Sequence, residues 1–291
     1  MRISDNMRFL TMERSIADLR SRQAQAANRA STGRRVIAPS DDPVAAAELT
    51  RIQSRLDRTQ DFRSTIQSVR SDASLSEATL AQASQFMVRA REIATQGAND
   101  TLNPADRAAL AVEVSALKEQ LLATANTRGT RGYLFSGTQT TTPTLSSTGS
   151  FQGDNQQHQV EIAPGVSSTV SVSGSLAFTA AGGVDAFATL DALAQALNAD
   201  DGRAVAATLG NLEASRDQMV RQQGQAGMIM NRLDTADEAL SVMDLELTKR
   251  QADLGAADPI ETLTELSKLT QALEQAIGVA RITLNTEVDR F

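Results

Sequence analysis

The amino-acid sequence predicts a mainly α-helical protein, built from elongated antiparallel coiled-coil-like rods with paired terminal helices and a small β-rich insertion at the distal end. Three observations predict this class. Apolar residues recur over long stretches at alternating steps of three and four, the spacing of a coiled-coil seam. Aromatic residues make up only 3% of the 291 residues, with no Trp and a single Tyr, which argues against a compact aromatic core. One central stretch rich in Gly, Ser and Thr interrupts the helical pattern.

The first predicted helix spans residues 4–32. Its apolar stripe recurs at three- and four-residue steps through Phe9, Met12, Ile16 and Leu19. Gly33 is a suitable position for this helix to end, because glycine readily adopts the left-handed conformation found after helix termini. Pro39 and Pro43 exclude a continuous helix through the following segment, since proline lacks a backbone N–H.

A long second helix is predicted from Pro43 to about Gln96. Asp42 before Pro43 is a start signal, because aspartate caps a helix N-terminus and proline is favoured at the first helical position. At about 1.5 Å per residue, the helix would be roughly 80 Å long. Its stripe passes through Leu49, Ile52, Leu56, Thr59, Ile66, Val69, Ala73, Ser76, Leu80, Ala83, Met87, Ala90 and Ala94. The small and polar members of the stripe require a partner that approaches closely.

A second rod is predicted over residues 203–254. Its main seam repeats every seven residues at Leu212, Met219, Ala226, Leu233, Leu240, Leu247 and Leu254. A companion seam passes through Ile229, Ala236 and Met243. Three glycines inside the pattern should weaken the helix by up to about 1 kcal/mol each, namely Gly210, Gly224 and Gly227. Gly255 and Pro259 end this rod, and a last helix is predicted from about residue 260.

Shorter elements are predicted between the rods. A helix capped by Asn103 ends near residue 127, and another covers residues 184–199. The periodicity between them, over residues 130–183, changes from helical to alternating. Strands are predicted at Tyr133-Leu134-Phe135, Val160-Glu161-Ile162 and Val170-Ser171-Val172.

The two ends of the chain, residues 1–33 and 257–291, carry opposite charge. Arginine dominates the first segment, whereas aspartate and glutamate dominate the last. Each is long enough for a helix but has too little apolar surface to be stable alone, since isolated helices gain most of their stability from packing. We predict that the ends pair with each other, or with further copies of themselves, and that they are mostly disordered before assembly.

Composition argues against several classes of protein. The net charge of −7 and the isoelectric point near 4.9 argue against general nucleic-acid binding, which needs a basic surface. Without cysteine, the chain has no disulfides, thiol nucleophiles or Cys-ligated metals. No run of about 18 apolar residues is present, so no membrane insertion is expected. The first 30 residues lack a continuous apolar core, so no cleavable secretory signal is expected.

Few side chains suggest chemistry. Asp41 and Asp42 are adjacent carboxylates without a histidine or third acid nearby, and we interpret them as helix caps and polar contacts between subunits. His158, the single histidine, lies in a Gln-rich loop and is interpreted as solvated. Tyr133 is interpreted as a core residue of a hairpin. We therefore expect no catalytic, cofactor-binding or metal-ligating residues, and no cofactor.

Several blocks of sequence resemble a known family, in order along nearly the whole chain. They are Met1-Arg2-Ile3-Ser4, Ser31-Thr32-Gly33-Arg34-Arg35-Val36, Pro39-Ser40-Asp41-Asp42-Pro43, Gly132-Tyr133-Leu134-Phe135-Ser136-Gly137 and Phe151-Gln152-Gly153-Asp154. With these residues the chain resembles bacterial flagellins and, more closely, the flagellar hook–filament junction proteins, a kind of hook-associated protein. It departs from their pattern after Asn285, where the family is usually richer in leucine.

The resemblance implies a layered subunit. Residues 1–33 and 257–291 would form inner paired terminal helices, residues 34–143 and 184–256 a helical rod domain with a β-hairpin, and residues 144–183 a small outer β insertion. The implied contact residues between subunits are Ser31, Thr32, Gly33, Arg34, Arg35, Val36, Pro39, Ser40, Asp41, Asp42 and Pro43. The terminal helices would pack through Phe9, Ile16, Leu266, Leu273, Ile277 and Leu284.

The implied function is structural: an adaptor ring in the bacterial flagellum that joins hook to filament and on which flagellin polymerises. The implied partners are further copies of the chain, a neighbouring hook-associated protein, flagellin, and a flagellar export chaperone with the type III export apparatus. The protein would be extracellular and exported without a cleaved signal peptide. Alternatives are a flagellin subunit of the filament itself, a cytoplasmic coiled-coil signalling or scaffold protein, and an enzyme, although the sequence shows no nucleophile–base pair or phosphate-binding loop.

Overall fold

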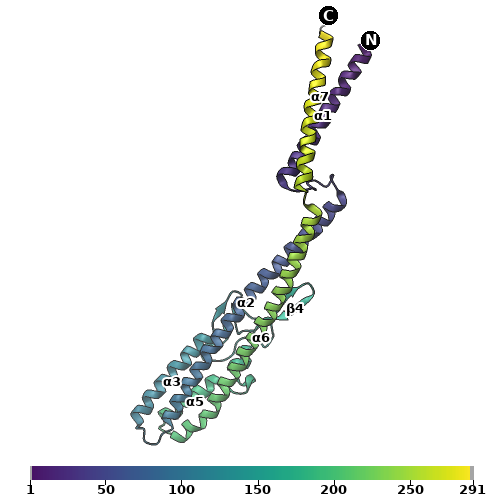
Figure 1. Cartoon of the computed structure of the whole chain (residues 1–291). Helices are drawn as coiled ribbons and strands as arrows, with labels where there is room; N and C mark the ends of the chain where they lie inside the picture. The colour runs from purple at the N-terminus through teal and green to yellow at the C-terminus, as the bar shows by residue number, and fades with distance from the viewer. Residues whose placement is uncertain (1, 289–291) are drawn as a thin grey trace. The chain divides into compact units, whose positions relative to one another are not determined.

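The structure is a computed structural model that describes residues 2–288, with side chains described for residue 7 and residues 9–282. This range contains seven α-helices, one short 3-10 helix and four strands, so the predicted mainly α-helical class is confirmed (Figure 1). The chain divides into two compact units. Unit 1 comprises Met1–Arg58 and Met243–Phe291, and unit 2 comprises Thr59–Val242. Leu284 and the unusual ending after Asn285 lie outside the residues whose side chains are described.

In unit 1 the two terminal helices lie side by side (Figure 1). They are α1 (Arg2–Thr32) and α7 (Pro259–Val288), and their predicted pairing is confirmed within one chain. Ala26 is buried, and Gln23 Nε2 donates a hydrogen bond to Thr270 Oγ1 at 3.0 Å. A buried alanine and a neutral hydrogen bond therefore contribute to the contact between the two helices.

The long helices begin and end at the predicted signals. Helix α2 (Pro43–Gly97) starts at Pro43, where Asp42 Oδ1 accepts the N–H of Ala45 at 3.0 Å. Helix α6 (Gly202–Gly255) ends at Gly255. The boundary between the units falls inside both helices.

Unit 2 contains the rest of α2 and α6 together with α3 (Pro104–Ala125) and α5 (Ala186–Asn198), which pack on each other. The heptad residues of α6 from Leu212 to Leu240 are buried, as are the α2 stripe residues from Ile66 to Ala94, which confirms both predicted seams. The predicted companion seam of α6 includes one residue too many, because the side chain of Met243 is 44% exposed. The packing of these seams supplies most of the core.

The strands of unit 2 form two small antiparallel pairs. They are β1 (Arg128–Gly129) with β2 (Gly132–Tyr133), and β3 (Gln159–Ala163) with β4 (Val166–Thr169). Gln159 pairs with Thr169, and the register shifts between Glu161 and Ala163. The predicted strand at residues 170–172 lies outside β4, so that prediction was wrong. Val170 and Val172 instead enter the helical core, where burial of their side chains replaces strand pairing.

Two short helices occupy residues that were predicted to belong to the β-rich insertion. They are α4 (Gly174–Phe178) and a 3-10 turn, Ala180–Gly182. Ser173 and Thr179 cap them by accepting the N–H groups of Leu176 and Ala181. The buried ring of Phe178 packs edge to face against Phe135, with centroids 5.5 Å apart. The sequence missed these helices because a five-residue helix is too short to show periodicity.

Both antiparallel strand pairs lie beside the helices of unit 2. Asp72 of α2 accepts the N–H of Thr130 at 2.7 Å, and Arg232 of α6 donates to Ser168 Oγ at 3.4 Å. The turns before α3 and α6 meet at the shared end of α2 and α6, which is where the β-rich insertion was predicted. The buried Arg107 joins these turns by donating to the carbonyls of Gly97 and Asn99 and pairing with Asp200.

Candidate assembly site

The segment between α1 and α2, residues 33–42, is called the first connector. Gly33 ends α1 in the left-handed conformation, with φ +65°. Asp41 Oδ2 accepts the backbone N–H groups of Ile37 and Ala38, each at 3.0 Å, and thereby folds the segment into a tight turn. These two hydrogen bonds satisfy the N–H groups of Ile37 and Ala38, which lie in a segment that Pro39 helps to keep out of a helix.

The first connector is joined to the second connector, residues 255–258, which links α6 to α7. Arg35 donates its backbone N–H to the carbonyl of Gly255 at 2.8 Å, and Ala257 donates to Gly33 at 2.9 Å. The Arg35 guanidinium donates to Asp42 Oδ2 at 3.1 Å and to the carbonyl of Leu254 at 3.0 Å. One arginine thus ties the start of α2 to the end of α6.

Both aspartates are stabilised as carboxylates. Hydrogen bonds from the N–H groups of Ala38 and then Ile37 hold the pKa of Asp41 below its ordinary value. The N–H of Ala45, followed by the guanidinium of Arg35, lowers the pKa of Asp42. This geometry agrees with the interpretation of Asp42 as a helix cap, whereas Asp41 instead holds the turn that precedes the helix.

The other residues of the predicted contact motif are mostly at the surface. Ser31 and Thr32 donate their hydroxyls to the carbonyl of Asn28, which completes the last turn of α1. Val36 is buried. The exposed members are Ser31, Thr32, Gly33, Arg34, Arg35, Pro39, Ser40, Asp41 and Pro43. Their contacts with neighbouring subunits stay a prediction. Because these side chains are exposed, a neighbouring subunit could reach them.

The second connector was not predicted as part of this site. Its backbone contributes two hydrogen bonds to the first connector, one at Gly255 and one at Ala257. The paired residues are about two hundred positions apart along the chain, so spacing carries no signal of their contact. Only the helix-ending signals at Gly255 and Pro259 mark the segment as a turn.

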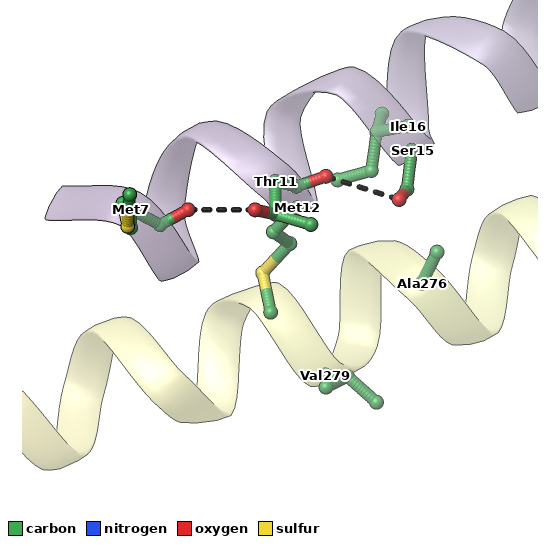
Figure 2. Close-up of a pocket in the computed structure, with 7 residues that line it drawn as sticks. All are labelled: Met7, Thr11, Met12, Ser15, Ile16, Ala276 and Val279. Carbon is green, nitrogen blue, oxygen red and sulfur yellow. Dashed lines mark hydrogen bonds between the residues drawn. The ribbon is translucent and has the colours of Figure 1, made fainter. Parts of the chain in front are cut away.

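A groove of about 660 Å³ runs between the terminal helices (Figure 2). Its lining residues are Met7, Thr11, Met12, Ser15, Ile16, Ala276 and Val279. Thr11 and Ser15 donate their hydroxyls to carbonyls of their own helix, and Met12 extends toward α7 (Figure 2). The groove is therefore mainly apolar, since its hydroxyl protons are already used.

The predicted packing residues of the terminal helices differ in exposure. Ile16, Leu266, Leu273 and Ile277 are half-buried. Phe9 is 52% exposed, although it belongs to the predicted stripe of α1. Pairing of the two helices within one chain therefore leaves part of that stripe exposed.

The remaining candidates show no arrangement for catalysis. The N–H of the half-buried His158 donates to Ser171 Oγ at 2.8 Å. Tyr133 is half-buried, with the Arg128 guanidinium 4.4 Å from its ring centroid. Within the described residues, no group of three or more His, Asp or Glu side chains is placed to hold a metal ion. None of the described helices is both long and apolar enough to cross a membrane.

Comparison with known proteins relates this architecture to the flagellum. Residues 3–140, which extend from α1 past β2, match the model of the bacterial flagellin N-terminal helical region. The predicted resemblance to flagellins is therefore confirmed for residues 3–140. This part of the chain includes the first connector and the predicted helix starts at Asp42-Pro43 and after Asn103.

Similar proteins are named as hook-associated proteins. The chain is 27% identical to flagellar hook-associated protein 3 of Escherichia coli K12, over 94% of each protein. A putative flagellar hook-associated protein from Vibrio parahaemolyticus has the same fold, with a TM-score of 0.69, 24% identity, and coverage of 74% of this chain and 100% of that one. The flagellar junction protein FlgL from Legionella pneumophila gives a TM-score of 0.56 at 20% identity, covering 73% and 100%.

Proposed function

We propose that this flagellin-like chain is a structural component of the bacterial flagellum that forms the adaptor ring between hook and filament. The names of its relatives as hook-associated and junction proteins support this function. The full-length similarity to hook-associated protein 3 supports it over a flagellin subunit of the filament, which remains the second candidate. We propose a structural role in preference to a catalytic one.

The exposed apolar surface of the terminal helices is the observation that most directly supports a role in assembly. Ile260 is 78% exposed and Leu263 is 60% exposed on α7, and Phe9 is exposed on α1. Burying a large apolar side chain contributes about 1.5–3 kcal/mol. Neighbouring subunits in a ring would cover these side chains, so assembly would gain free energy that the single chain lacks.

The layered arrangement follows as part of the proposal. Residues 1–33 and 257–291 would face the inside of the ring, and the motif from Ser31 to Pro43 would contact adjacent subunits. The β segment, residues 144–183, would lie on the outside. Its apolar side chains share the core of unit 2, so it would be an attached face of the rod domain.

The further partners are a neighbouring hook-associated protein on one side of the ring and flagellin on the other. A flagellar export chaperone and the type III export apparatus would deliver the chain, without a cleaved signal peptide, to the outside of the cell. The exposed apolar surface of α7 supports the need for a chaperone before assembly, since such patches favour association.

Electron microscopy of a strain lacking this chain tests the function. We expect complete hooks without filaments, and flagellin released unpolymerised into the medium. Loss of only a segment of the filament would support a flagellin subunit instead. A purified chain added to isolated hooks should bind at hook ends and restore filament growth.

The cytoplasmic scaffold alternative is tested by the location of the protein. We expect the intact chain in the culture medium of a mutant whose hooks are complete but lack the adjoining hook-associated protein. Retention of the whole pool inside cells with a working export apparatus would favour the scaffold.

A further inference from the structure

A second groove, of about 620 Å³, opens in unit 1 between the first connector and the helices α2 and α6. Its apolar lining includes Val36, Ile37, Leu49 and Ala252, and Arg34 lies along the same wall. Ile37 is 47% exposed while it lines this groove. The groove therefore remains open to a side chain from outside the chain.

The groove carries positive charge that the chain does not neutralise locally. In the described part of the chain, no carboxylate lies within ion-pairing distance of the Arg34 guanidinium. Arg35 is already paired with Asp42, and Asp41 accepts two backbone N–H groups. A carboxylate from another molecule could pair with Arg34 without breaking any of these contacts.

The first turns of α7 carry apolar and acidic side chains that complement the apolar lining and the arginine of the groove. Ile260 and Leu263, spaced i and i+3, form an exposed apolar ridge on one face of the helix. Glu261 and Glu265 are also exposed beside the ridge, and no ion pair holds either of them among the described side chains. The ridge thus combines two apolar side chains with two free carboxylates.

The opposite charges of the terminal helices are not consumed by pairing within the chain. Where side chains are described, no ion pair joins α1 to α7, although the two helices pack along each other. The ion pair recorded in α1 links Arg22 to Asp18 of the same helix. Arg34 of the first connector and the acidic start of α7 are therefore both available to neighbouring molecules.

We propose that the ridge Ile260–Leu263 of one copy of this chain docks into the groove beside the first connector of the next copy, with Glu261 or Glu265 paired to Arg34. This inference rests on the proposed ring function and names the contact between its subunits. Ridge and groove are different surfaces, so the contact is head-to-tail. Head-to-tail contacts close into rings or continue as helices, whereas a self-complementary contact would stop at a dimer.

The absence of cysteine makes disulfide crosslinking a clean test. Chains with Ile37→Cys are mixed with chains carrying Leu263→Cys, both in solution and on isolated hook ends, and are then oxidised. We expect a crosslinked heterodimer from the mixture. Chains with Val112→Cys, an exposed apolar position of unit 2, mixed with Leu263→Cys are the matched control and should give only background. Ala38→Cys replaces Ile37→Cys if circular dichroism shows that the latter loses helix.

Charge reversal then tests the predicted ion pair. Arg34→Glu should weaken the association between copies about tenfold, which corresponds to 1.4 kcal/mol, and Glu261→Arg together with Glu265→Arg should restore it. Equal crosslinking by the control pair, or no crosslink on hook ends that have bound the chain, would overturn this contact while the ring function stands. Failure of the unmodified chain to bind hook ends would instead contradict the ring function. In that case, crosslinking in solution would show whether the ridge of one copy contacts the groove of another.

Discussion

Two adjacent aspartates show how single residues position the connector. Asp41 and Asp42 accept backbone N–H groups as carboxylates, so their pKa values are lowered in the folded chain. A group with a lowered folded pKa stabilises the fold above its unfolded pKa, about 3.9 for aspartate, and loses that effect as pH falls through the folded value. The connector should therefore be stable at neutral pH and open in strong acid.

We predict that amide protection of Ile37, Ala38 and Ala45 stays constant from about pH 7 to about pH 5 and falls between about pH 4 and about pH 2. Hydrogen exchange followed by mass spectrometry or NMR measures this. Asp41→Asn should lower the protection of Ile37 and Ala38 already at neutral pH, with Ala45 unaffected. Protection that is unchanged at about pH 2 would contradict the assigned role.

Arg107 is the buried charge at the turns of unit 2. Arg107→Ala would leave the carbonyl of Gly97 without its side-chain donor and the carbonyl of Asn99 with the N–H of Leu102 alone, and it would remove the partner of Asp200. We expect a loss of about 3 kcal/mol in the free energy of unfolding. Chemical denaturation measures it, with Arg250→Ala as the control, since Arg250 pairs with Glu246 on the surface and should contribute below about 1 kcal/mol.

At the scale of elements, α6 contains glycines whose cost is not offset by contacts. A Cβ added at Gly224 would meet nothing within 4 Å. Gly224→Ala should therefore stabilise the protein by up to about 1 kcal/mol through helix propensity alone. Gly174→Ala is the matched contrast, because its Cβ would collide with the carbonyl oxygen of Phe135. Denaturation midpoints that move in the same direction for both variants would contradict this reading.

The prediction of elements succeeded where the signal was long or chemically specific. The heptad repeat from Leu212 to Leu247 indicated the buried face of α6, and Asp42-Pro43 indicated the start of α2. It failed over residues 170–182, where Val170 and Val172 were assigned to a strand and α4 was missed. Short segments take their conformation from the core into which they pack, so local pattern is a weak guide there.

At the scale of the whole molecule, the two units differ in how much apolar surface they bury. Unit 2 holds a contiguous core that includes Phe135, Leu193 and Leu212, whereas Ala26 is the one fully buried apolar residue of α1 among its described side chains. We predict that in the soluble monomer residues 1–33 exchange their amides much faster than the core of unit 2. Hydrogen exchange tests this, and strong protection of residues 1–33 before assembly would count against it.

Assembly should reverse that difference, because neighbouring copies would cover Phe9, Ile260 and Leu263. Protection of the terminal helices should rise when the chain binds hook ends, while the core of unit 2 stays unchanged. A rise confined to unit 2 would contradict the proposed inner position of the terminal helices.

The sequence by itself determined the helical class, the buried seams, the helix starts and the likeness to flagellins, because these depend on periodicity and on local hydrogen bonding. Only the tertiary structure decided that Arg35 donates to Gly255 and Ala257 donates to Gly33, and that Phe9 stays exposed when α1 and α7 pair. Contacts between residues some two hundred positions apart depend on how complete helices pack. No local spacing encodes that packing.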